Sequence, residues 1–227
     1  MRCILCGRGM GKKMKTEILY EDEVVLVVHK KAGMATQSAR DFEMDVESEL
    51  KNYLKGSELH VIHRLDQVVE GILVFAKTGA AAADLSAQLT GDRMEKIYTA
   101  RCLGKLEEPS GTLIDYLVKL PNGMAKVSSG KGGRMAKKCI LHYETVDYDA
   151  PNDVSTLRIR LETGRFHQIR VQLAHAGHPL IGDRKYGSAE ANQKAIQMGL
   201  RFVALCASEL SFDHPGTGER MSFSLED

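Results

Sequence analysis

Tryptophan is absent from this chain of 227 residues, and aromatic residues make up only 6% of it. Clefts that bind sugars commonly use aromatic rings as platforms, so this scarcity disfavours a glycoside hydrolase. Cysteine is also sparse, with five residues at positions 3, 6, 102, 139 and 206. An odd number of scattered cysteines argues against a disulfide framework. Cys3 and Cys6 form a lone pair without a second pair, so we predict no metal site.

The chain also lacks any apolar run long enough to span a membrane, and it has no signal-peptide pattern. These absences favour a cytoplasmic protein that does not bind membranes. Positive charge is not in excess, because 31 Lys and Arg residues face 30 Asp and Glu residues and leave a net charge of +1. A nucleic-acid partner would therefore need a local basic patch rather than a uniformly basic surface.

Apolar runs and alternating patterns predict more strands than helices. We expect strands over residues 24–28, 71–77, 96–103, 112–120, 139–146, 154–162 and 203–212, the last of them being the final strand of the chain. Helical spacing and capping residues predict helices over residues 45–54, 78–89, 166–176 and 188–198. Because strands often follow one another directly, the fold class is α+β with a largely antiparallel sheet.

No internal repeat and no low-complexity linker divides the chain. We therefore expect one domain over residues 17–227, preceded by a flexible basic tail over residues 1–16. A domain of this length can bury a sizeable core.

One carboxylate lies directly before the most apolar strand. His63-Arg64-Leu65-Asp66 leads into an apolar run over residues 71–76 that reads as a buried strand, which places Asp66 on the loop that enters it. A carboxylate in such a position loses hydration and needs a cationic or hydrogen-bonding partner to stay ionised.

Basic residues gather in one interval between two predicted strands. They alternate with Gly and Ser and comprise Lys119, Lys126, Lys131, Arg134, Lys137 and Lys138. The interval is either an RNA-binding patch or a solvated loop, and composition alone does not separate the two.

Three motifs occur in the order found in one enzyme family. The segment HRLDQVVEGILVFAK at 63–77, the segment KIYTA at 96–100, and the segment GRFHQIR at 164–170 with its continuation through 187 resemble motifs of the RluA-type pseudouridine synthases. The resemblance extends over roughly residues 18 to 225. It implies a mixed sheet with a central active-site cleft flanked by helices and loops. It also implies isomerisation of uridine in RNA: the base is cut from ribose at N1 and rejoined through C5, with no redox change and no cofactor.

The resemblance assigns three catalytic residues. Asp66 is the catalytic carboxylate, and it either attacks covalently or stabilises positive charge at C1′ while a ribose proton leaves. Arg170 pairs with Asp66, because a guanidinium can hold a carboxylate ionised in one orientation. Tyr98 stacks on the target base and takes part in proton transfer.

Other motif residues are expected to contact RNA. Arg64 helps to extract the target nucleotide from its stem. The remaining predicted contacts either shape the site or touch RNA, and they comprise His63, Arg165, His167, Gln168, Lys131, Arg134 and Lys137. Asp183 is predicted to be a turn or ion-pair residue. The expected partner is a ribosomal or transfer RNA stem-loop, bound by a monomer that lacks the extra N-terminal RNA-binding domain of many relatives.

Two other functions compete with this reading. A non-catalytic RNA-binding protein could keep the same fold, although the presence of Asp66, Tyr98 and Arg170 disfavours it. A glycoside hydrolase could use Asp66 and Glu70 as its two carboxylates. Glu70 also marks a departure, since many relatives have Thr-Ser where this chain has Val69-Glu70.

Overall fold

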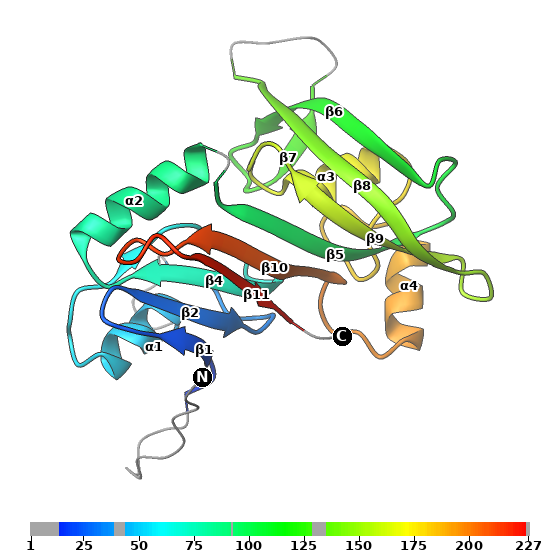
Figure 1. Cartoon of the computed structure of the whole chain (residues 1–227). Coiled ribbons are helices and arrows are strands. Elements are labelled where there is room, and N and C mark those ends of the chain that lie inside the picture. The colour runs from blue at the N-terminus through cyan, green and yellow to red at the C-terminus, as the bar shows by residue number, and fades with distance from the viewer. Residues whose placement is uncertain (1–13, 39–43, 92, 129–134, 226–227) are drawn as a thin grey trace.

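One mixed sheet organises the computed structural model, which describes residues 14–38, 44–91, 93–128 and 135–225 (Figure 1). Its main path runs in the order β1-β2-β4-β10-β5-β9-β8-β6-β7, while β3 pairs with β4 and β11 pairs with β10. The strands are β1 (Glu17–Glu21), β2 (Val25–Lys30), β3 (His60–Val61), β4 (Glu70–Ala76), β5 (Glu95–Leu103), β6 (Ser110–Lys119), β7 (Ala125–Val127), β8 (Lys137–Asp149), β9 (Val154–Leu161), β10 (Leu205–Asp213) and β11 (Arg220–Ser224).

The sheet has two wings that meet at β10. Figure 1 shows β1, β2, β4 and β11 on one side of it and β5, β9, β8, β6 and β7 on the other. Among the described strands, β4 and β10 form the only parallel pair, and the remaining pairs are antiparallel. At their contact Gly71 has a φ of +144°, and a Cβ placed there would lie 2.5 Å from that of Ala207. Gly71 therefore lets β10 approach closely.

The strands β2 and β4 are buried on both faces. Four helices complete the domain: α1 (Val46–Tyr53), α2 (Gly79–Thr90), α3 (Gln168–His175) and α4 (Ala189–Gln197). One face of β2 and β4 packs with α1 residues in a core that continues into the other wing, and the opposite face packs with α2 residues in a second core. This double burial explains why both strands are continuous apolar runs rather than alternating ones.

Three of the four predicted helices have the predicted starts. Asp45, Thr78 and Ser188 each cap a helix by accepting a hydrogen bond from the backbone amide three residues later. The fourth prediction was wrong at its start, because α3 begins at Gln168 instead of at residue 166. His167 adopts left-handed backbone angles, φ 55° and ψ 26°, which a right-handed helix does not contain.

The sequence analysis missed four strands. β1, β3, β7 and β11 are short, and β3 has only two residues, so none carries a long enough pattern. The predicted final strand is therefore not the last one, because β11 follows β10. The strand β10 also starts two residues later than predicted, at Leu205.

The predicted basic tail lies mostly outside the described residues, including Cys3 and Cys6. Where the description begins, the backbone amides of Lys15 and Thr16 donate to the carboxylate of Glu49 on α1, at 2.8 and 2.9 Å. Within the described part of the chain, no helix is long and apolar enough to cross a membrane.

Candidate active site

A long cleft of about 1540 Å³ draws its lining from both wings of the sheet. This volume exceeds the roughly 300–1,000 Å³ of a typical small-molecule site, so the cleft suits a larger, polymeric ligand. Its walls include the segments 63–69 and 160–170, which carry parts of two of the three sequence motifs, and also Gly182, Arg184 and Lys185. Among the described residues, no cluster of three or more His, Cys, Asp or Glu side chains is arranged to hold a metal ion.

The segment that carries Asp66 is extended and alternates between buried and accessible side chains. His63 and Leu65 are buried, whereas Arg64 is exposed and Asp66 is partly exposed. The backbone at Leu65 is fixed on both sides by Thr36, whose hydroxyl donates to the Leu65 carbonyl and accepts from the Leu65 amide, each at 3.1 Å. This alternation places Asp66 at the surface of the cleft.

A fully buried lysine supports the same segment from beneath. The Lys30 ammonium donates to the carbonyl of Met34 at 2.7 Å and to those of Lys31 and Gln67 at 3.3 Å each. Burial lowers the pKa of Lys30 to about 8, although the negative charges of Asp66 and Glu70 oppose the shift. The sequence analysis missed this residue, and the available signal was a lysine at the end of an apolar strand.

Asp66 is held through one of its two carboxylate oxygens. Its Oδ2 lies 3.1 Å from Arg170 Nη1, which confirms the predicted contact, and 3.4 Å from His167 Nε2. The Asp66 side chain is 26% exposed, while that of Arg170 is 4% exposed. The carboxylate is thus oriented by buried partners but remains accessible from the cleft.

The firmest partner of Arg170 is Asp183, not Asp66. Arg170 donates from Nε and Nη2 to the two Asp183 oxygens at 2.7 Å each, and the Asp183 side chain is 1% exposed. Asp183 also accepts from the backbone amides of Lys185 and Tyr186. It is therefore both the turn residue and the ion-pair residue that the sequence analysis predicted, but that analysis did not place it in the site.

The two groups of this buried pair stabilise each other's charged form. Burial disfavours that form for each group, but the hydrogen bonds and the opposite charges between them outweigh the effect of burial. The pKa of Arg170 is raised and the pKa of Asp183 is lowered. Both groups stay ionised, so Arg170 presents a fixed positive charge to Asp66.

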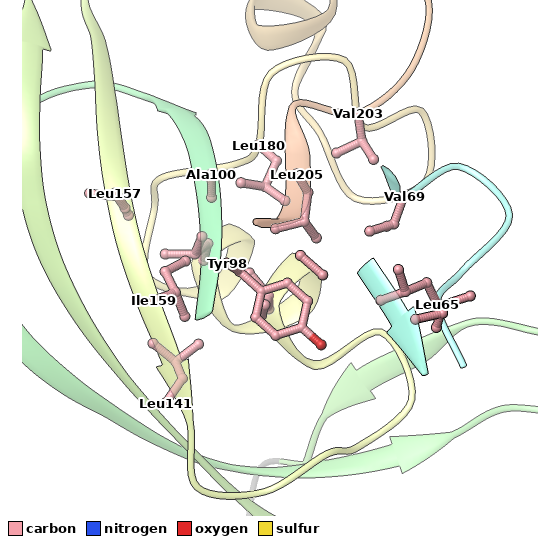
Figure 2. Close-up of a cluster of buried hydrophobic side chains, with 14 of the residues drawn as sticks. Leu65, Val69, Tyr98, Ala100, Leu141, Leu157, Ile159, Leu180, Val203 and Leu205 are labelled. Carbon is pink, nitrogen blue, oxygen red and sulfur yellow. The ribbon is translucent and has the colours of Figure 1, made fainter. Parts of the chain in front are cut away.

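Tyr98 lies within the larger core cluster, where Figure 2 shows its ring among apolar side chains that include Leu65 and Ile159. The residue is 7% exposed and also lines the cleft. Burial, followed by the charge of Asp66, raises the pKa of its phenol. Tyr98 is therefore a neutral, rigidly packed ring close to Asp66.

The predicted RNA contacts fall into two groups. Arg64 and Arg165 are exposed and line the cleft. His63 and Gln168 are buried, and the Gln168 amide binds Thr163, Arg165 and Ile140 within the protein. Burial lowers the pKa of His63 to about 3, so this ring is neutral and supports the cleft from below.

Of the predicted basic interval, Lys119 lines the cleft, whereas Lys137 begins β8 without lining it. Lys131 and Arg134 lie outside the described residues. Other cations reach the cleft from separate parts of the chain, namely Lys96, Arg160, Arg184, Lys185, Arg201 and Arg220. Their separation in sequence, from 96 to 220, hid this grouping from the sequence analysis.

Glu70 does not supply a second carboxylate to the cleft. It accepts from His29 Nε2 at 2.7 Å and lies 3.5 Å from the Lys31 ammonium, among residues that do not line the cleft. A glycoside hydrolase that uses Asp66 and Glu70 as its two carboxylates is therefore disfavoured.

Comparisons with known proteins agree with this geometry. Residues 24–175 match the family model described as RNA pseudouridylate synthase. The chain is 34% identical over 236 aligned residues to ribosomal large subunit pseudouridine synthase D of Pseudomonas aeruginosa, and this alignment covers 96% of this chain and 70% of the relative. It is 35% identical to an uncharacterized RNA pseudouridine synthase of Bacillus subtilis, and that alignment covers 89% of this chain and 66% of the relative.

A solved structure confirms the fold. Human RNA pseudouridylate synthase domain containing 1 superposes with a TM-score of 0.78 at 22% identity, over 97% of this chain and 86% of the human one. The chain therefore has the α+β fold with a mixed sheet that the motifs implied.

Proposed function

The chain belongs to the RNA pseudouridylate synthase family, whose members isomerise uridine within RNA, and we propose that this one acts on ribosomal RNA of the large subunit with Asp66 as its catalytic carboxylate. The observation that carries the proposal is the accessible Asp66 held by the buried Arg170. Relatives from Pseudomonas aeruginosa and Pasteurella multocida are named as ribosomal large subunit pseudouridine synthases, which supports the choice of substrate.

The two oxygens of Asp66 have different surroundings. Oδ2 is occupied by Arg170 and His167, whereas no described residue forms a hydrogen bond or ion pair with Oδ1. We assign Oδ1 to the substrate. It acts at C1′ of the target ribose as the bond from C1′ to N1 breaks. The freed uracil then turns, C5 bonds to C1′, and the C5 hydrogen leaves as a proton.

Tyr98 is proposed to stack on the detached uracil and to donate a hydrogen bond to it while the C5 hydrogen leaves to solvent as a proton. Its ring is held by the core cluster, so it presents a fixed face to the base with little entropy cost. Its raised pKa keeps the phenol protonated near neutral pH, so it can donate a hydrogen bond to the uracil.

The cationic side chains along the cleft are proposed to bind the RNA backbone. Arg64 lies two residues from Asp66 and is exposed, which suits a group that enters the helix when the target nucleotide is flipped out. Lys119, Arg165 and Arg184 are candidates for phosphate contacts. The same proposal places a monomer in the cytoplasm, where its RNA is found.

Tritium release tests the proposal directly. RNA that carries 5-tritiated uridine loses tritium when C5 forms its new bond, so release reports the isomerisation. We expect wild-type protein to release tritium from ribosomal RNA of cells that lack this protein. Asp66→Asn is expected to abolish turnover and to leave RNA affinity within a few-fold, because the carboxylate acts in the chemistry.

Matched substrates decide the class of RNA. Large-subunit RNA, small-subunit RNA and transfer RNA are tested side by side, since each offers structured stems and loops. Release from transfer RNA alone would contradict the choice of substrate, and normal turnover by Asp66→Asn would contradict the role of Asp66.

A further inference from the structure

A second aromatic residue contacts the Asp66 site through His167. The hydroxyl of Tyr186 lies 2.6 Å from His167 Nδ1, and it accepts a hydrogen bond from the Ala125 amide at 2.8 Å. The other ring nitrogen, His167 Nε2, faces Asp66 Oδ2 at 3.4 Å. His167 therefore joins Tyr186 to the predicted catalytic carboxylate.

The contacts determine which nitrogen of His167 carries the proton. An ionised carboxylate is only an acceptor, so a lone pair on Nε2 would face another acceptor at 3.4 Å. With the proton on Nε2, the ring donates toward Asp66, and Nδ1 accepts the proton of the Tyr186 hydroxyl. This tautomer gives Nδ1 a donor and turns the Nε2 proton toward an acceptor. The distance of 3.4 Å is long for a hydrogen bond, as is common for catalytic contacts before substrate binds.

His167 stays neutral in this position. It is 9% exposed, and burial together with the charge of Arg170 lowers its pKa to about 4, against the raising effect of Asp66. The exposed ring of Phe166 stacks on it with centroids 3.7 Å apart, and Lys119 lies over the Phe166 ring at 4.7 Å. A neutral ring at this place can shape the site through hydrogen bonds, which is one of the two roles that the sequence analysis left open.

The backbone gives independent evidence for a specific role. His167 has φ 55° and ψ 26°, and although it precedes α3 it makes no side-chain cap. Left-handed angles at a ring-bearing residue cost of order 1–3 kcal/mol and concentrate at functional sites. The imidazole at this strained position contacts both Tyr186 and Asp66.

We propose that His167, fixed by Tyr186 in the tautomer protonated at Nε2, is a positioning residue that holds Asp66 Oδ2 and so directs Oδ1 toward the substrate. This inference rests on the proposed function and deepens it. Arg170 supplies a charged donor to Asp66 Oδ2, and His167 directs a second, uncharged donor toward the same oxygen. Two contacts to one oxygen restrict the rotation of the carboxylate more than one contact does.

Kinetics of two His167 variants separate positioning from RNA binding. His167→Asn tolerates left-handed backbone angles but its shorter side chain does not reach Asp66. We expect its kcat for tritium release to fall about 10- to 100-fold, with the KM for RNA within about twofold. His167→Gln restores a donor at the position of Nε2 and is expected to recover part of the loss. A raised KM with unchanged kcat would overturn the proposal.

Tyr186→Phe tests the second link. It removes the hydroxyl that holds Nδ1, and we expect kcat to fall about 3- to 10-fold with KM unchanged. Tyr148→Phe is the matched control. Tyr148 is on β8, its hydroxyl donates to Asp153 at 2.8 Å, and neither residue lines the cleft. Equal losses in the two variants would overturn the proposal.

Nitrogen NMR of the free protein reads the tautomer without any turnover. We expect His167 to be protonated at Nε2 at neutral pH, and its Nε2 resonance to move in Asp66→Asn. A proton on Nδ1 would overturn the inference even if the enzyme is active. Conversely, an inactive wild-type protein with the expected resonances would contradict the proposed function and leave the arrangement of His167 intact.

Discussion

The segment that carries Asp66 and the segment that holds it are built in opposite ways. Residues 63–66 belong to no helix or strand and alternate in burial, and they leave the Asp66 side chain 26% exposed. Residues 167–173 are buried in succession, and the Arg170 and Asp183 side chains are 4% and 1% exposed. The reacting group is accessible and its holder is not. The comparison separates two demands on the site, namely access for the substrate and a fixed direction for the carboxylate.

Asp183→Asn should have the largest effect on the holding segment. It leaves Arg170 with a buried and poorly compensated charge, which typically costs about 3–5 kcal/mol of unfolding free energy. We expect a clear drop in denaturant midpoint and a fall in kcat of about 100-fold, measured by urea unfolding and tritium release. Asp66→Asn, at a partly exposed position, should change the midpoint far less. Equal midpoints for the two variants would remove the distinction between reacting group and holder.

Lys30→Met tests how the accessible segment is supported. The substitution removes the ammonium that donates to the carbonyls of Met34, Lys31 and Gln67. Unsatisfied buried carbonyls cost about 1–3 kcal/mol each, partly relieved by local movement. Because Gln67 adjoins Asp66, we expect kcat to fall about tenfold with RNA affinity unchanged. Retention of full kcat would show that Asp66 is positioned from the holding segment alone.

Each segment also contains a neutral buried histidine, and low pH should destabilise the fold through both of them. The pKa of His63 is lowered to about 3 and that of His167 to about 4, whereas in the unfolded chain each titrates near 6.5. Between these values the unfolded state binds more protons, so stability falls as pH falls below about 6.5. We expect a loss of about 1–2 kcal/mol per histidine by pH 5.

Urea unfolding at pH 7 and pH 5 measures this loss. His63→Gln has no titrating ring, so its stability should depend less on pH than that of the wild type over the same interval. A loss of equal size in both proteins would assign the pH dependence to other groups.

The smallest expected effect concerns RNA binding along the rim. Lys119→Ser combined with Arg184→Ser removes two cleft cations and should lower the slope of log affinity against log salt by about 0.7–0.9 per lost phosphate contact. Lys194→Ser on α4, which does not line the cleft, serves as the control. A slope unchanged in the double variant would place the phosphate path elsewhere.

The sequence predicted the strands with the strongest patterns and the helices with clear caps. β2 and β4 were found because double burial makes them continuous apolar runs, and α2 was found because Thr78 caps an apolar, alanine-rich segment. The start of α3 was missed because the angles of His167 arise from tertiary contacts that no local pattern encodes. The short strands β1 and β11 depend on pairing with β2 and β10, which lie beyond local reach.

The sequence predicted the site residues that lie in recognisable motifs. It did not predict those whose role depends on contacts between distant segments. Asp66, Tyr98 and Arg170 came from motifs, and the structure brings Asp66 and Arg170 into contact. Lys30 lies outside the three motifs, and Tyr186 lies in the continuation of the third motif without an assigned role. Each acquires its role only from the carbonyls or the ring that the fold places next to it.

The position of β10 affects how the chain can be made. Among the described strands it is the only one that joins the two wings, by parallel pairing to β4 and antiparallel pairing to β5. During synthesis the earlier strands leave the ribosome first, and β4 and β5 expose unpaired edges until residues 205–213 arrive. The cleft is therefore incomplete until β10 has been synthesised. Translation that stalls before β10 would leave two half-sheets with unpaired edges that are prone to aggregate.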